Sequence, residues 1–159
     1  LAELRGLQRR TDEVGAAHRT YLNLPNLELR QKAIVQNNLA YVLAGTGFGD
    51  EALEMISNSI EHLGPTADLL DTRAMAHLAR GDSINAIRDL RGALAAGDTA
   101  MKLFHLAQAE LAAHNEAAAA KAFQQAIDLD LSEVVMAEFE YSRFQKLQKM
   151  LGPGQKLEL

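Results

Sequence analysis

The sequence predicts an all-α fold, a solenoid built from antiparallel helix pairs, and three observations lead to this fold class. Alanine and leucine dominate the composition, aromatic residues make up 5% and tryptophan is absent, which suits closely packed helices better than β-strands. Three segments that begin at Ala33, Ala67 and Ala100 are similar to one another, and their starts lie 34 and 33 residues apart. Residues that start, end and connect helices recur at matching places, so each segment is expected to hold two helices.

Residues 1–32 are expected to form an N-terminal helical element. Leu4, Leu7, Val14 and Tyr21 recur at spacings that place them on one side of a helix. A small residue before Tyr21 and a proline after it also fit the remains of an earlier repeat. The sequence therefore leaves open whether this element is one helix or a degenerate repeat.

The next part of the chain is expected to form three helical hairpins, at 33–66, 67–99 and 100–131. The first helix of each hairpin repeats a small residue, at Ala40, Ala74 and Ala107. Each second helix repeats an alanine with a large apolar residue four positions later, as Ala52 with Ile56, Ala86 with Leu90, and Ala119 with Phe123. Two helices approach closely only where small side chains lie at the crossing and larger ones fill the grooves beside it.

Capping residues indicate where the helices begin. The second helices are expected to start after Asp50, Asp82 and Asn115, and the first helices after Thr66 and after Asp98 or Thr99. These residue types accept hydrogen bonds from the free amides of a first helical turn.

The C-terminal part is expected to close the solenoid. Residues 132–151 place Met136, Phe139, Phe144, Leu147 and Leu151 on one side of a helix. A solenoid needs such an amphipathic helix to cover the last exposed apolar face, so we expect a capping helix. Residues 152–159 are expected to form a loose tail.

The repeats resemble the tetratricopeptide repeat, a helix–turn–helix unit with a period near 34 residues, across residues 33–131. The sequence departs from that family pattern because it has no tryptophan, has alanine in place of the glycine of the first helix, and keeps the closing proline only as Pro65. The resemblance implies a right-handed superhelical solenoid whose first helices line a concave groove that binds peptide segments.

Carried onto this chain, the resemblance implies that the groove is lined by Asn37, Tyr41, Asp71, Met75, Leu78, Phe104, Gln108 and Leu111. The apolar and aromatic members are typical anchors at recognition sites, and the amides of Asn37 and Gln108 can bind a peptide backbone. For Met75 and Phe104, burial against a neighbouring repeat is an equally good interpretation. Asp71 either attracts a basic ligand or belongs to a plain solvated face.

Motifs for chemistry are absent from the sequence. There is no cysteine, the five histidines form no ligand-like pair, and neither a nucleophile elbow nor a phosphate-binding loop is present. We therefore expect a protein that is not an enzyme, with no catalytic residue, no cofactor and no metal.

Charge and hydropathy limit the classes of partner that the chain is expected to bind. Residues 33–66 hold four acidic residues and neither lysine nor arginine, in a chain of net charge −5, which disfavours binding to nucleic acid. No apolar run approaches the length that spans a bilayer, so direct membrane insertion is not expected. The compartment stays open, with the cytoplasm slightly favoured. Because the chain opens with Leu1 and not with methionine, we expect it to be a fragment or a processed product.

The function that these observations favour is a protein–protein interaction scaffold that binds a peptide segment or a neighbouring domain of apolar or basic character. Acidic chaperone tails are not expected to bind, because the first helices lack the lysines and arginines that grip them. One alternative is a regulatory or assembly segment of a larger enzyme or secretion component, and another is self-association through an exposed end face.

Overall fold

The computed structural model describes residues 13, 16, 20, 28–131 and 136–151, and the bounded elements among them are all α-helices. The helices are α2 Leu29–Gly45, α3 Gly49–Leu63, α4 Ala67–Ala79, α5 Ser83–Leu94, α6 Ala100–Ala112, α7 Glu116–Asp128 and α8 Glu138–Leu151. The predicted all-α class is confirmed for this part of the chain. Most of the expected N-terminal element and the expected tail lie outside the described residues.

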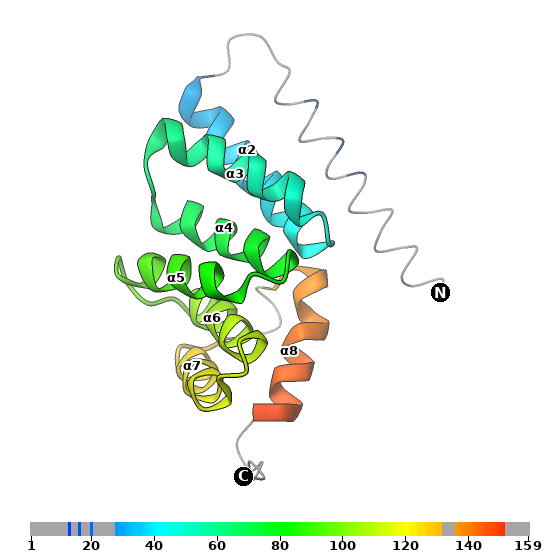
Figure 1. Cartoon of the computed structure of the whole chain (residues 1–159), viewed down its shortest axis with the longest axis vertical. Helices are drawn as coiled ribbons and strands as arrows, with labels where there is room; N and C mark the ends of the chain where they lie inside the picture. The colour runs from blue at the N-terminus through cyan, green and yellow to red at the C-terminus, as the bar shows by residue number, and fades with distance from the viewer. Residues whose placement is uncertain (1–12, 14–15, 17–19, 21–27, 132–135, 152–159) are drawn as a thin grey trace.

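Helices α2 to α7 follow one another as three hairpins stacked in chain order (Figure 1). The two helices of α4/α5 and of α6/α7 fall inside the ranges expected for the second and third hairpins. Helix α2, however, begins at Leu29, before the expected start at Ala33. The reason is local, because the backbone N–H of Glu28 donates to the Gln31 side chain at 3.2 Å and so closes the first turn earlier.

Capping side chains start three of the helices where the sequence indicates. The hydroxyl oxygens of Thr66 and Thr99 accept from the backbone N–H groups of Leu69 and Lys102, and the Asp82 carboxylate accepts from the N–H of Asn85 at 3.1 Å. Of the two residues considered for α6, Thr99 is therefore the cap. Each such bond stabilises a helix by about 1 kcal/mol.

The start expected after Asp50 is wrong, because α3 already begins at Gly49 with Phe48 in the capping position. The turn between α2 and α3 is held by a hydrogen bond of 2.8 Å from the backbone N–H of Phe48 to the Leu43 carbonyl. Gly49 then packs so closely on α4 that a side-chain carbon there would lie 2.9 Å from the Ala79 side chain. Asp50 instead forms an ion pair with Arg80 at 2.6 Å.

The small residues that define the repeat are buried where helices cross. Ala40, Ala74 and Ala107 of the first helices are each 0% exposed. Their partners in the second helices are buried as well, namely Ala52, Ile56, Ala86, Leu90, Ala119 and Phe123. Since a small residue lies at each crossing and a larger one fills the groove beside it, the core runs through the stack.

Ion pairs join neighbouring helices across the stack. Arg73 of α4 donates two hydrogen bonds to the Asp89 carboxylate of α5, both of 2.6 Å. Arg91 of α5 donates to Glu110 of α6 at 2.9 Å. Glu110, which is an unusual residue to bury, is 2% exposed because Arg91 and the Asn115 side chain both donate to it.

Helix α8 does not add another layer to the end of the stack but runs along its side (Figure 1). In its C-terminal half, Phe144 and Leu147 are buried against α6 and α7. Its N-terminal half continues to α2, where Phe139 packs on Tyr41 with ring centroids 5.2 Å apart. This path lies over the side of the first helices where the groove is expected.

Candidate functional site

The residues expected to line the groove lie on the first helices of the three hairpins, α2, α4 and α6, but their exposure differs. Met75 and Phe104 are 2% and 0% exposed, so both side chains belong to the core. Asn37, Tyr41, Asp71, Leu78, Gln108 and Leu111 are partly exposed. The side-chain oxygen of Asn37 is itself buried and has no hydrogen-bond partner among the described residues.

Helix α8 covers the α2 end of this face. Gly45 closes α2 beneath the Phe139 ring, and a side-chain carbon at this position would collide with that ring. The guanidinium of Arg143 lies over the same ring, 6.0 Å from its centroid, and donates to the Gly45 carbonyl at 3.2 Å. The sequence therefore needs glycine at position 45 to let α8 approach α2.

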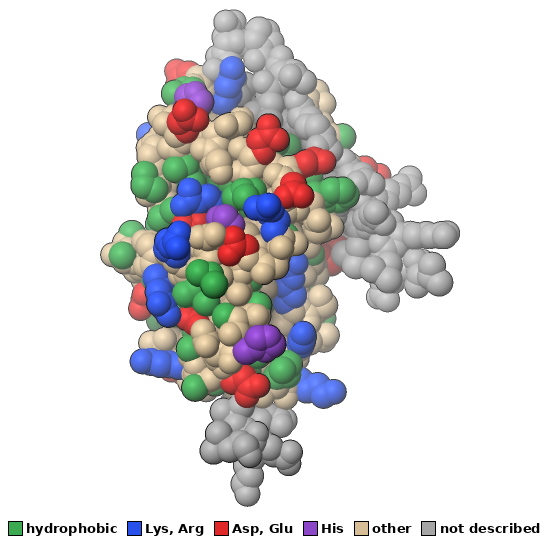
Figure 2. Space-filling view, in the orientation of Figure 1, with side chains coloured by type: hydrophobic (Ala, Val, Ile, Leu, Met, Phe, Trp, Pro, Cys, Tyr) green, Lys and Arg blue, Asp and Glu red, His purple; other side chains and the backbone are tan. Residues whose placement is uncertain are grey.

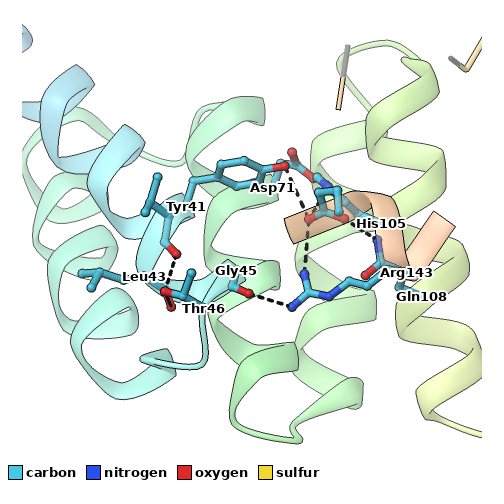
Figure 3. Close-up of polar contacts among 10 residues, drawn as sticks. Tyr41, Leu43, Gly45, Thr46, Asp71, His105, Gln108 and Arg143 are labelled. Atoms are coloured by element: carbon cyan, nitrogen blue, oxygen red, sulfur yellow. Dashed lines mark hydrogen bonds and ion pairs between the residues drawn. The ribbon is translucent and has the colours of Figure 1, made fainter. Parts of the chain in front are cut away.

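A buried polar network fastens α8 to the first helices (Figure 3). The Glu140 side chain is 0% exposed and accepts hydrogen bonds from the Tyr41 hydroxyl, the Gln108 amide and the Arg143 guanidinium at 3.4, 3.1 and 3.2 Å. Nε2 of His105 lies 3.6 Å from Glu140 Oε1, an ion-pair separation longer than a hydrogen bond. One carboxylate of α8 thus contacts side chains of α2 and α6.

His105 links this carboxylate to α4, because its Nδ1 lies 2.8 Å from an Asp71 oxygen. Burial lowers the pKa of His105, but attraction to Asp71 and Glu140 outweighs it and raises the pKa to about 10. Burial raises the pKa of Glu140, but the nearby positive charges of His105 and Arg143 outweigh burial, so the pKa lies below its usual value. At neutral pH the imidazolium and the guanidinium therefore balance the two carboxylates.

Tyr41 completes the network and does not ionise in the neutral range. Burial, together with the neighbouring charge of Glu140, raises its pKa well above the usual value. Its hydroxyl therefore stays a hydrogen-bond donor to Glu140, and its ring stays packed between Phe139 and His105.

The charged side chains of this network are buried and lie next to one another. His105 and Glu140 are 1% and 0% exposed. A search of the described residues for three or more metal-ligating side chains in one place finds no such group. The arrangement is a clamp between α8 and the face of the first helices.

Sequence reasoning missed this clamp, although one signal pointed to half of it. Asp71 and His105 lie 34 residues apart, one more than the 33-residue offset between the second and third repeats, so His105 directly follows the residue equivalent to Asp71 on the next first helix. Glu140 lies outside the repeats and offered no such signal. Because His105 balances the charge of Asp71, Asp71 no longer supports the expectation of a basic partner.

Between the clamp and the end of the stack, α4, α6 and α8 enclose a pocket of about 300 Å³. Its apolar walls are formed by Met75, Leu78, Ala79, Leu111, Ala112 and Leu147. Gln108, Arg143 and Lys146 supply the polar part of the lining. Four expected groove residues, Met75, Leu78, Gln108 and Leu111, thus meet here, whereas Asn37, Tyr41, Asp71 and Phe104 are not among the lining residues.

A second depression lies on α5 and the α6–α7 turn, lined by Ile84, Ile87, Arg88, Arg91, Ala113 and Asn115. Its most exposed apolar residue is Ile84, at 72%. Only the first pocket is walled by three helices of which one, α8, comes from outside the repeats. We therefore regard the pocket between α4, α6 and α8 as the candidate site.

The described residues thus form stacked helix pairs, with a pocket between α4, α6 and α8. A scan against protein-family models finds no match to the chain, and a search of curated protein sequences finds none either. Among the described residues, none of the helices has both the length and the apolar character that a membrane crossing requires.

Proposed function

We propose that this chain is a protein–protein interaction scaffold of the tetratricopeptide type, which binds a peptide segment of a partner in the pocket between α4, α6 and α8. The observation that carries the proposal is the pocket itself, an apolar depression of about 300 Å³ with polar side chains at one side. Ligand sites have this composition, and this volume lies at the lower end of their usual range of roughly 300–1,000 Å³, which suits one or two side chains of a peptide.

The repeat architecture supports the proposal. The buried alanines at each crossing and the stacking of three hairpins are what a right-handed superhelical solenoid of such repeats requires. Solenoids of this kind expose an extended face, and the partly exposed side chains of Leu78, Gln108 and Leu111 lie on the first helices that would form it. The clamp of Glu140 and His105 keeps α8 in place beside them.

A role in binding fits better than a role in catalysis. The buried charges described above pair with one another, and the pocket lining contains no histidine, serine, threonine or carboxylate to act as a base or nucleophile. Its side chains offer apolar contact, an amide and two positive charges, which are groups that recognise a ligand.

A peptide library displayed on phage tests the proposal. Peptides enriched on the wild-type protein are measured against Ala112→Trp, which fills the mouth of the pocket, and against Ala118→Trp, a matched change at an exposed position of α7. We expect binding to survive in Ala118→Trp and to fall at least tenfold in Ala112→Trp. A library without any binder, or binders indifferent to Ala112→Trp, would contradict the proposal.

A further inference from the structure

The charges at the pocket all have one sign. Its lining includes the basic side chains of Arg143 and Lys146 and no aspartate or glutamate. Arg143 already donates to Glu140 and to the Gly45 carbonyl. Lys146 is exposed, and within the described part of the chain it has no carboxylate at ion-pair distance. A positive charge beside an apolar pocket is thus left for a ligand.

The rest of α8 strengthens this charge. Arg143, Lys146 and Lys149 follow one another at intervals of three residues, so they lie along one side of the helix. Glu140, the acidic residue nearest to them in sequence, is 0% exposed and is balanced by His105. Figure 2 shows lysine and arginine side chains along the strip where α8 lies, although the whole chain carries a net charge of −5.

We infer that the pocket takes a peptide with acidic and apolar character, in which an apolar side chain enters between Leu78, Leu111 and Leu147 while a neighbouring carboxylate pairs with Lys146. This inference rests on the proposed function and names the chemistry of the partner. The carboxylate is an aspartate or glutamate side chain of the partner, and a partner's free C-terminus is the alternative that the test below distinguishes. Opposite charge across the rim selects between ligands and speeds their approach.

This inference differs in sign from the sequence-based expectation of an apolar or basic partner. That expectation rests on Asp71, and Asp71 lies 2.8 Å from His105. The positive charges come from α8, which the repeat pattern does not contain.

The test uses four fluorescein-labelled peptides of twelve residues with a central leucine in a glycine–serine background. Two glutamates flank the leucine in the first peptide, two glutamines in the second and two lysines in the third, all three with amidated C-termini. The fourth peptide ends on leucine with a free carboxylate. Fluorescence anisotropy measures their binding to the wild-type protein and to Lys146→Gln, with Lys121→Gln at an exposed position of α7 as the matched control.

We expect the glutamate peptide to bind about tenfold more tightly than the lysine peptide, with the glutamine peptide between them. Lys146→Gln should weaken the glutamate peptide about threefold, as expected for one exposed ion pair, and leave the glutamine peptide unchanged. Lys121→Gln should change neither. Tighter binding of the fourth peptide than of the first would assign the carboxylate to a partner's C-terminus, and the reverse would assign it to a side chain.

Equal binding of the glutamate and lysine peptides, or equal binding to the wild type and Lys146→Gln, overturns the inference. If those peptides still lose binding in Ala112→Trp, the proposed function stands and only the charge preference fails. If none of the four binds and the phage library also yields nothing, both fail together.

Discussion

Replacing Glu140 by alanine should loosen α8 from the face of the first helices and destabilise the protein. The change leaves the buried His105 imidazolium with Asp71 as its remaining charge partner, and it removes the acceptor of Tyr41, Gln108 and Arg143. Breaking a buried ion pair by removing one partner costs about 3–5 kcal/mol. Because Asp71 still balances His105, we expect the lower end of that range.

Urea denaturation followed by circular dichroism at pH 7 measures this loss. Glu140→Gln keeps an acceptor in place without the charge and should cost less, about 1–2 kcal/mol. Glu54→Ala, at an exposed position of α3, serves as the control and should change stability by less than about 0.5 kcal/mol. If Glu140→Ala lost less than about 1 kcal/mol, the polar network would not be what holds α8, and the account of the clamp would be refuted.

Three further predictions concern pH and packing. The pKa of His105 is about 10 in the folded protein and 6.5 in the unfolded chain. Its contribution to stability is therefore complete below pH 6.5 and is lost as the pH rises towards 10. The free energy of unfolding should fall over this range by up to about 1.4 kcal/mol per pH unit, and His105→Gln should abolish this slope. Gly45→Ala should cost about 1–3 kcal/mol in a urea titration, because the added carbon collides with the Phe139 ring, and an unchanged midpoint would show that α8 does not approach α2 as described. Asp89→Ala should lower the unfolding free energy by about 1.5–3 kcal/mol, because Asp89 is buried and accepts both hydrogen bonds from Arg73. Asp50→Ala breaks an equally short but exposed pair with Arg80 and should cost less than about 1 kcal/mol, so equal losses in the two variants would contradict the weight given to burial.

Local features of the fold could be predicted from the sequence because they depend on neighbouring residues. The caps Thr66, Thr99 and Asp82 act within the next three positions along the chain. The repeated alanines predict where the helices cross, since only a small side chain fits at a close helix crossing. The start of α3 shows the limit, because the helix begins at Gly49, which packs on α4, and not after Asp50 as the sequence predicts.

The site was harder to predict because α8 reaches it from outside the repeats. The bond between Tyr41 and Glu140 joins residues 99 positions apart, and no periodicity relates them. Without α8, the sequence suggested a groove with Asp71 and Phe104 open to a ligand. In the structure Phe104 is 0% exposed, so truncating it would leave a cavity costing about 3–5 kcal/mol and would not be a clean test of the groove.

Peptide binding in the pocket between α4, α6 and α8 can be tested directly. The most direct test is paramagnetic broadening of backbone amide signals in NMR spectra, with a nitroxide on a peptide enriched from the phage library. We expect the broadening to be strongest around Leu78, Leu111 and Lys146, on the three helices that line the pocket. Broadening centred on Ile84 and Arg88 in the second depression, or spread evenly over the surface, would contradict it.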